Sequence, residues 1–151
     1  MPEPAAASLR PAAAKDLAAV RELLREAKLH LEGLEKQFGG HYAVAELEGK
    51  LVGAMGIEVY GRYGLLRSAV VAPAHRGSGL GARLTRERIA WADARRIEAL
   101  YVLTVTAAPF FARLGFVEVP RKSAPAEVQA SLEFAKLCGS NSVCMRMDLA
   151  K

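Results

Sequence analysis

Residues 70–81 read VVAPAHRGSGLG and predict three elements in direct succession. The β-branched pair ends a run that is typical of a buried strand, and from Gly79 to Ala94 the apolar residues recur at helical spacing. Between the two lies a basic, glycine-rich loop. Backbone N–H groups at the start of a helix bind phosphate, and glycine leaves no Cβ in the way of the ligand. Four arginines add positive charge around this predicted anion-binding loop: Arg76, Arg83, Arg86 and Arg88.

The loop admits other interpretations. A Walker A loop is excluded because no Gly-Lys-Ser/Thr follows. The dinucleotide fingerprint G-x-G-x-x-G/A is met by Gly77, Gly79 and Ala82. That fingerprint, however, requires the first glycine close behind the strand and an acidic residue at the end of the next strand, where this sequence has Thr104. A turn whose glycines only let the helix pack against the strand is the interpretation without a ligand.

The rest of the sequence predicts strands and helices on both sides of this loop. Before it, we expect an extended start at 8–10, a helix from Leu17 to Ala27 that Asp16 caps, a second short helix at 31–38, strands at 41–47, 51–60 and 65–71, and a hairpin framed by Gly61 and Gly64. After it, we expect helices at 79–94, 107–114 and 125–137 and strands at 98–104, 116–119 and 142–149. This order predicts a mixed α/β (α+β) fold with a central mixed, mostly antiparallel sheet flanked by helices.

Length and composition indicate one globular domain over residues 1–151. Hydrophobic residues make up 52% of the chain, charged residues make up 25%, and the mean hydropathy is +0.11. These values exclude a disordered or collagen-like chain. The net charge of +5 suits an anionic ligand, but with only 7% aromatic residues it does not indicate a nucleic-acid-binding protein.

The cysteines and histidines indicate neither a disulfide framework nor a metal site. Cys138 and Cys144 match no zinc or redox spacing, and His30, His41 and His75 are dispersed along the chain. The first residues lack the apolar segment of a signal peptide, and the apolar stretches are far shorter than a membrane span. We therefore expect a cytoplasmic protein without a metal, a membrane or a nucleic-acid partner.

The loop also resembles that of a known enzyme family. Arg76-x-x-Gly79-x-Gly81 is similar to the pyrophosphate loop of the GNAT superfamily of N-acetyltransferases, whose pattern is Gln/Arg-x-x-Gly-x-Gly/Ala. Two further matches are VAP at 71–73 and the later helix-to-strand corner FFARLGF at 110–116. With the order of elements, the resemblance covers about the whole chain and implies a GNAT-like acyl-CoA N-acyltransferase fold.

Four stretches are similar to a narrower group, the arsenic-resistance N-acetyltransferase family, which itself is similar to short amino-acid N-acetyltransferases of the N-acetylglutamate synthase type. These stretches are residues 65–68, 101–106, 110–116 and 133–145. The resemblance implies acetyl-CoA as cosubstrate and a small, amino-acid-like amine as acceptor, in this group an arsenic-containing analogue of glutamate. It also implies a homodimer, because many relatives dimerise.

The resemblance assigns residues to acetyl-CoA. The backbone of Ala69, Val70 and Val71 is expected to pair with the pantetheine arm. The N–H groups of the loop and of the first helical turn are expected to hold the pyrophosphate, and these belong to Arg76, Gly77, Ser78, Gly79, Leu80, Gly81 and Ala82. For Arg76, an exposed surface cation is the alternative.

Three side chains that the family often uses are absent. The resemblance places Phe111 where a tyrosine protonates the departing thiolate, Thr104 where an asparagine commonly starts the helix, and Leu65 where a glutamate base often stands. The chemistry is then expected to depend largely on the alignment of the reactants and on water that carries the proton.

Other residues are candidates for the acceptor side. Glu58, in an otherwise apolar strand, is expected to take a proton from the ammonium substrate or to bind it. Arg67 has the same strand parity as Ala69 and Val71 and is expected to bind a substrate carboxylate. The alternative for Glu58 is an exposed strand residue or one paired with Arg67, and the alternative for Arg67 is a structural ion pair. Tyr60 is a candidate substitute acid, with a place on the sheet face as its alternative.

Hydroxyl side chains complete the candidate set. Thr104 is a tentative catalytic residue and Thr106 a candidate for substrate binding, with capping of the following helix as their alternative. By resemblance to glutamate acetylators, Ser140, Asn141 and Ser142 are expected to hold a substrate carboxylate, and a simple polar turn is the alternative.

The function implied is direct attack of the amine on the thioester in a ternary complex. A covalent acyl-enzyme on Cys144 is the open alternative for the mechanism. For the acceptor, the alternatives are glutamate itself, another amino acid or a protein α-amine. The alternative of another class is a CoA-binding module that has lost catalysis.

Overall fold

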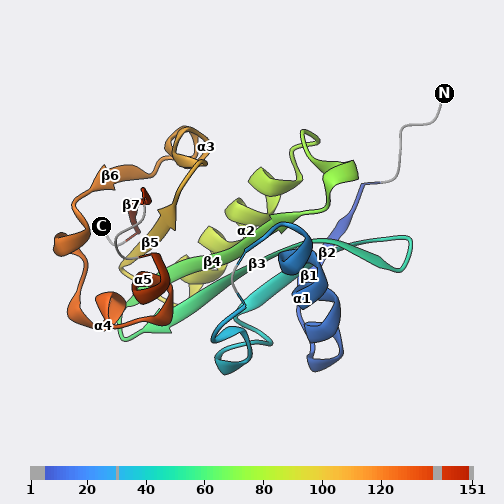
Figure 1. The fold of residues 1–151 in the computed structure, drawn as a ribbon, viewed down its shortest axis with the longest axis horizontal. Coiled ribbons are helices and arrows are strands. Elements are labelled where there is room, and N and C mark those ends of the chain that lie inside the picture. Colours follow the sequence, from blue (N-terminus) through green and yellow to red (C-terminus); the bar gives the residue numbers. More distant parts are fainter. Residues whose placement is uncertain (1–5, 30, 138–140, 150–151) are drawn as a thin grey trace. The chain divides into compact units, whose positions relative to one another are not determined.

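The structure is a computed structural model that describes residues 6–29, 31–137 and 141–149 (Figure 1). Its strands are β1 (Ser8–Pro11), β2 (Tyr42–Leu47), β3 (Lys50–Tyr60), β4 (Tyr63–Val71), β5 (Ala99–Thr104), β6 (Val117–Val119) and β7 (Val143–Asp148). Its α-helices are α1 (Leu17–Glu26), α2 (Leu80–Ala94), α3 (Ala108–Arg113), α4 (Ala126–Gln129) and α5 (Leu132–Leu137).

The strands form a sheet in the order β1-β2-β3-β4-β5-β7-β6. The pairs β1–β2, β2–β3, β5–β7 and β6–β7 are antiparallel, and β4–β5 is parallel from Tyr63 opposite Ala99 to Leu66 opposite Val102. A parallel pair needs a crossover, which α2 supplies between β4 and β5. The predicted mixed, mostly antiparallel sheet with helices is therefore confirmed.

The chain divides into two compact units. The first contains the described residues up to Gly56 together with Ser68–Arg88, and the second contains Ile57–Arg67 and the described residues from Ile89 onward. A single domain over the whole chain stays a prediction.

In the first unit, two helices pack on opposite faces of β3. Val20 and Leu24 of α1 lie in one buried cluster with Ala54. A Cβ added to the preceding residue, Gly53, would lie 3.1 Å from Leu84 of α2. Because successive residues of a strand point to opposite faces, α1 and α2 cover different faces, and the small residue at position 53 lets α2 approach closely.

In the second unit, alternate residues of β5 face two different layers. Tyr101 belongs to a buried cluster with Val128 of α4 and Phe134 of α5. Leu100, which precedes Tyr101, points to the opposite face of the sheet. A Cβ added to Gly64 would lie 2.8 Å from the Leu100 side chain. The helices α4 and α5 therefore cover one face of this part of the sheet (Figure 1).

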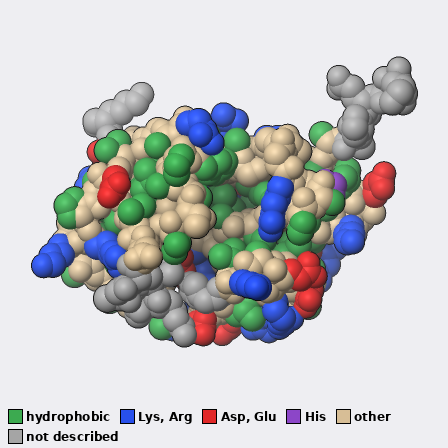
Figure 2. Space-filling view, turned by 45° about the horizontal axis from the view of Figure 1, so that its top comes forward, with side chains coloured by type: hydrophobic (Ala, Val, Ile, Leu, Met, Phe, Trp, Pro, Cys, Tyr) green, Lys and Arg blue, Asp and Glu red, His purple; other side chains and the backbone are tan. Residues whose placement is uncertain are grey.

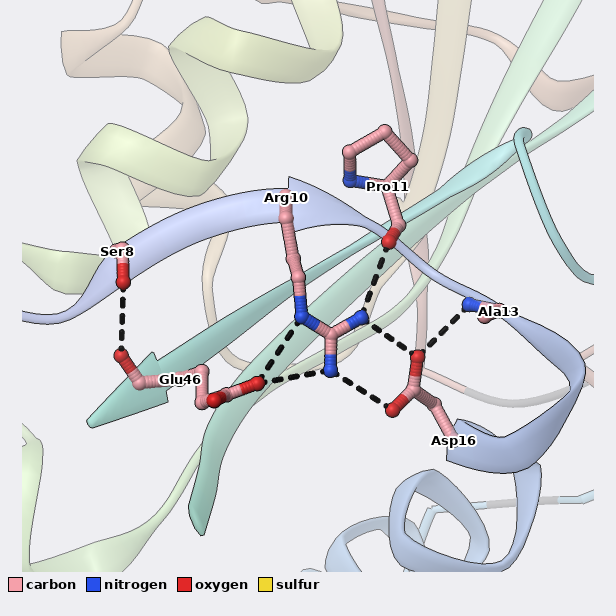
Figure 3. A network of polar contacts seen from close by, with 6 residues as sticks. All are labelled: Ser8, Arg10, Pro11, Ala13, Asp16 and Glu46. Carbon is pink, nitrogen blue, oxygen red and sulfur yellow. Dashed lines mark hydrogen bonds and ion pairs between the residues drawn. The ribbon is translucent and has the colours of Figure 1, made fainter. Parts of the chain in front are cut away.

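Asp16 does not cap α1 as predicted. Its carboxylate lies one turn earlier, where it accepts a hydrogen bond from the Ala13 N–H at 2.7 Å and pairs with both terminal nitrogens of Arg10 at 2.8 and 2.9 Å (Figure 3). Arg10 also reaches Glu46 on β2 at 2.8 Å. Asp16 has helical backbone angles of φ −85° and ψ −11°, whereas an N-cap residue is extended. The Arg10 guanidinium is the main cause that lowers the pKa of Asp16 to about 2.

Three element boundaries differ from the predictions. The short helix expected at 31–38 is one 3₁₀ turn at Leu34–Lys36, which follows Gly33 in the left-handed conformation. The helix expected at 125–137 divides into α4 and α5, because the Ser131 hydroxyl accepts the Phe134 N–H and starts a new helix. The hairpin turn uses Gly61 with φ +64°, whereas Gly64 lies inside β4, where its missing Cβ leaves room for Leu100.

Candidate active site

The loop before α2 adopts a conformation that glycine favours. Gly77 has φ +79° and Gly79 has φ +86°, values that L side chains rarely adopt. A Cβ built on either residue has no atom within 4 Å. These glycines are therefore required by their backbone angles, and the space beside them is open to a ligand.

Backbone donors gather at the same place. The 15-residue helix α2 begins at Leu80, directly after the loop. The first four N–H groups of an α-helix have no partner within the helix and carry its positive dipole end. The first intrahelical bond near the loop runs from the Arg83 N–H to the Gly79 carbonyl at 3.0 Å. The donors expected to hold the pyrophosphate thus lie in one short stretch of the first unit.

Two side chains of the loop donate hydrogen bonds to nearby backbone carbonyls. The Nε of Arg76 donates to the Val71 carbonyl at 3.2 Å, and the Ser78 hydroxyl donates to the His75 carbonyl. Arg76, Arg83 and Arg86 are exposed. Arg88 does not add charge here as predicted, because it is 1% exposed and donates to the His41 carbonyl and to Glu87. It faces inward, since it lies four residues after the buried Leu84 on the same helix face.

Strand β4 changes its backbone conformation just before the predicted pantetheine contacts. Ser68 has φ +56°, which interrupts the extended alternation of side chains. Beyond it, Ala69 is exposed while Val70 is buried. Arg67 and Ala69 were expected to face the same side of the strand because they are two residues apart. The change of backbone conformation at Ser68 removes the basis for this expectation.

The second unit contains a buried polar group that we call the Glu58 cluster, made of Glu58, Tyr60 and Arg67. Nη1 of Arg67 donates to Oε2 of Glu58 at 2.9 Å, and the Tyr60 hydroxyl donates to Oε1 at 2.6 Å. Glu58 is 3% exposed and Arg67 is 2% exposed. The structure therefore contains the ion pair that was an alternative for both residues. Arg67 and the Tyr60 hydroxyl together give the buried carboxylate a donor on each oxygen, as a charge in an apolar strand requires.

Tyr60 holds its proton tightly. Burial raises the pKa of its hydroxyl well above the usual range, and the hydrogen bond to Glu58 and the negative charges of Glu58 and Glu133 raise it further. Glu133 was not among the predicted site residues. It is 6% exposed while its neighbour Leu132 is 38% exposed, the reverse of what residue type suggests. An acidic residue in the first turn of a helix is ordinary, so the sequence carried no signal of its burial.

The other predicted acceptor residues lie in the second unit. The Thr104 hydroxyl accepts the Ala107 N–H at 2.9 Å in the turn before α3, but Ala107 is the N-cap of α3 and no described side chain caps this helix, so the capping alternative is wrong for Thr104. Thr106 is exposed. Ser142 is buried and its carbonyl accepts a hydrogen bond from Arg121. Ser140 lies outside the described residues, as do Cys138 and His30.

The positions where the family often has catalytic side chains are filled with core residues. Leu65 is fully buried and Phe111 is 4% exposed, with its ring packed against Phe116. Cys144 on β7 is 1% exposed, and burial raises the pKa of its thiol to about 11. A thiol needs its thiolate form to act as a nucleophile, so this environment disfavours an acyl-enzyme on Cys144.

Three further features of the described residues concern a metal site, a membrane helix and the distribution of charge. Within the described residues, no three or more His, Cys, Asp or Glu side chains gather to hold a metal ion. No helix in that part of the chain is both long and apolar enough to cross a membrane. On the face drawn in Figure 2, Lys and Arg side chains are scattered among Asp and Glu.

Comparison with known proteins identifies the family. Residues 38–118, more than half of the chain, match the acetyltransferase (GNAT) domain. No curated protein matches the sequence.

Several solved structures share the fold. The N-acetylglutamate synthase from Neisseria gonorrhoeae, complexed with coenzyme A and N-acetyl-glutamate, superposes with a TM-score of 0.85 at 23% identity, over 99% of this chain and 36% of that chain. This chain thus spans about a third of that synthase. Rv2747 from Mycobacterium tuberculosis, in complex with CoA, has a TM-score of 0.78 at 26% identity, over 94% and 99% of the two chains. The ribosomal-protein-S18-alanine N-acetyltransferase from Escherichia coli has a TM-score of 0.74 at 16% identity, over 95% of each chain. The chain belongs to the GNAT acetyltransferase family.

Proposed function

We propose that the protein transfers the acetyl group of acetyl-CoA to the amine of a small, amino-acid-like substrate by direct attack in a ternary complex. The observation that carries this proposal is the loop before α2. Gly77 and Gly79 combine left-handed backbone angles with open space beside the N–H donors of a long helix. That arrangement suits the pyrophosphate of acetyl-CoA. The backbone of 69–71 on β4 is the proposed partner of the pantetheine arm.

For the acceptor, we propose an amine that arrives as an ammonium ion. The Glu58 carboxylate attracts a cation, and its hydrogen bonds to Tyr60 and Arg67 keep it in one position. Thr104, Thr106 and Ser142 remain proposals for contacts near the reacting groups. Arg67, the proposed ligand of a substrate carboxylate, donates to Glu58 through Nη1.

The finer proposal is a glutamate-like acceptor, including the arsenic-containing analogue that the resemblance implies. Its support is that resemblance, together with the shared fold of the Neisseria synthase, which is complexed with N-acetyl-glutamate. Glutamate itself, other amino acids and protein α-amines are the competing acceptors that an assay must separate.

The chemistry that this chain supplies is mainly alignment. The amine nitrogen attacks the thioester carbon and the CoA thiolate leaves. Neither Phe111 nor Leu65 can donate or accept a proton. Thiolate is a good leaving group, and aligned reactants alone lower the barrier by roughly 7–11 kcal/mol in favourable cases.

Release of free CoA thiol from acetyl-CoA, measured across a panel of amines, tests the proposal. The panel contains L-glutamate, its arsenic-containing and phosphinic analogues, other amino acids, an aminoglycoside and a peptide with a free α-amine. Selective turnover of the arsenic analogue supports a detoxifying enzyme, and selective turnover of glutamate supports a biosynthetic one. Peptide turnover alone contradicts the small-molecule acceptor. Binding of CoA without turnover of any amine contradicts the proposed reaction.

A further inference from the structure

The direction of the hydrogen bonds in the Glu58 cluster gives Tyr60 a role of its own. The phenolic O–H donates to Oε1 of Glu58 at 2.6 Å, and Arg67 occupies Oε2 at 2.9 Å. A phenol that donates its proton still has oxygen lone pairs with which it can accept another. Tyr60 can therefore receive a proton on its oxygen while it passes its own to Glu58.

Burial sets the order in which an incoming amine meets these groups. Glu58, Arg67 and Glu133 are each 6% exposed or less, whereas Tyr60 is partly exposed. Of these four groups, Tyr60 is the one that solvent and solutes reach. An amine would meet the hydroxyl of Tyr60 before the carboxylate behind it.

The charges around Tyr60 exclude the role of a simple acid. Glu58 on β3 and Glu133 on α5 place negative charge beside the hydroxyl, and Arg67 on β4 offsets it only in part, so the pKa of Tyr60 is raised. Donation of the proton to a departing thiolate would leave a half-buried phenolate beside two carboxylates. Tyr60 can lose its proton only in a step that replaces it.

We propose that Tyr60 relays the proton of the acceptor ammonium to Glu58, and that Arg67 is a positioning residue that holds Glu58 for this transfer. One N–H bond of the ammonium breaks and an O–H bond forms on the Tyr60 oxygen. The original Tyr60 O–H breaks at the same time and an O–H forms on Oε1 of Glu58. The products are a neutral amine, a neutral phenol and a neutral carboxylic acid, so the phenol carries no charge at either end of the step. This inference rests on the proposed function.

The test compares two acceptors that differ in whether they need deprotonation. L-Glutamate carries an ammonium at neutral pH, while its aminooxy analogue, with the same carboxylates, has a nitrogen that is largely unprotonated. We expect Tyr60→Phe to lower kcat/KM for glutamate by about 100-fold or more, which is the rate enhancement that a general base typically contributes. For the aminooxy analogue the loss should stay within about threefold. If the amine panel selects another acceptor, that acceptor and its aminooxy analogue take their place.

The matched control is Tyr63→Phe, which removes the same atom from the other tyrosine of this hairpin, one that packs edge-on against Tyr101. It should leave both acceptors unaffected. A second variant guards against misfolding, because Glu58→Gln alone would leave a buried arginine without its counter-charge. The double variant Glu58→Gln with Arg67→Gln removes both charges and should reproduce the acceptor-dependent loss of Tyr60→Phe.

A readout without turnover checks the coupling between the two residues. The Tyr60 hydroxyl is followed by NMR of ring-labelled tyrosine and assigned with Tyr60→Phe. In the double variant its pKa should fall only in part, because the hydrogen bond to Glu58 and the charge of Glu58 are gone while burial and Glu133 still raise it. An unchanged pKa overturns the relay. Equal losses for both acceptors in Tyr60→Phe overturn the relay and leave the proposed function intact. An absence of turnover with every amine overturns the proposed function, and the relay with it.

Discussion

Gly56 is a position at which one added methyl group should greatly lower the free energy of unfolding. Gly56 lies opposite Tyr42 in the β2–β3 pair. A Cβ at position 56 would lie 2.6 Å from Cε1 of Tyr42 and closer still to Cζ and Cε2. The Tyr42 ring is fully buried in the cluster that contains Val20 and Leu24 of α1, and it cannot move aside freely. Overpacking of this kind typically costs about 1–3 kcal/mol. We expect Gly56→Ala to lie at the upper end, at about 3 kcal/mol.

Urea denaturation followed by circular dichroism measures this free energy of unfolding. The control is Gly40→Ala, at an exposed glycine where a Cβ meets no atom within 4 Å. It should change stability by less than about 0.5 kcal/mol. In a Tyr42→Leu background the added penalty of Gly56→Ala should fall below about 1 kcal/mol, because the clashing ring atoms are gone. A loss under about 1 kcal/mol in the native background, or the same loss in both backgrounds, would refute the steric account.

Three further predictions concern other parts of the chain. Asp16→Asn should lower stability at neutral pH by up to about 2 kcal/mol. Because the folded state lowers the pKa of Asp16 from 3.8 to about 2, this contribution should vanish as the pH falls from about 4 to 2, and a gap between Asp16→Asn and wild type that persists at low pH would contradict it. Glu48→Asn should raise stability by roughly 0.5–1 kcal/mol in the same urea assay, since Glu48 and Gly49 both have positive φ in a two-residue hairpin turn that favours Asn-Gly, and an unchanged midpoint would argue against this. Cys144→Ala should leave kcat/KM within about a factor of two, because the buried thiol is not expected to act as a nucleophile. Complete loss of activity in a folded variant would instead support a covalent acyl-enzyme on Cys144.

The glycine-rich loop and its flanking elements show which structural features can be predicted from neighbouring residues in the sequence. The glycine-rich stretch, the strand before it and the helix after it were all predictable, because positive φ values, β-branched residues and helical periodicity are local properties. The same holds for the hairpin turn at Glu48 and Gly49, and for Leu65 and Phe111 as apolar core residues. Each of these signals lies within a few residues of the feature it predicts.

The remaining features depend on contacts between distant residues. Asp16 has the residue type of an N-cap, yet Arg10 and the Ala13 N–H hold its carboxylate elsewhere. Arg67 and Glu58 are nine residues apart, and only the hairpin of β3 and β4 joins them. No pattern in the sequence marks Ser68 as the one residue of β4 with positive φ, since serine rarely adopts it. The burial of Glu133 likewise follows from tertiary packing.

Binding of CoA measured by calorimetry tests the central claim, that the loop before α2 holds the pyrophosphate. Gly79→Asp places a carboxylate beside that site, and Gly49→Asp is its control. Both glycines have positive φ, +86° and +79°, and open space around the missing Cβ. Two like charges about 4 Å apart near a protein surface repel by about 4 kcal/mol. We predict that Gly79→Asp weakens CoA binding by about 100-fold or more while Gly49→Asp leaves it unchanged. Equal affinity in the two variants would contradict the assignment of the loop to the cosubstrate.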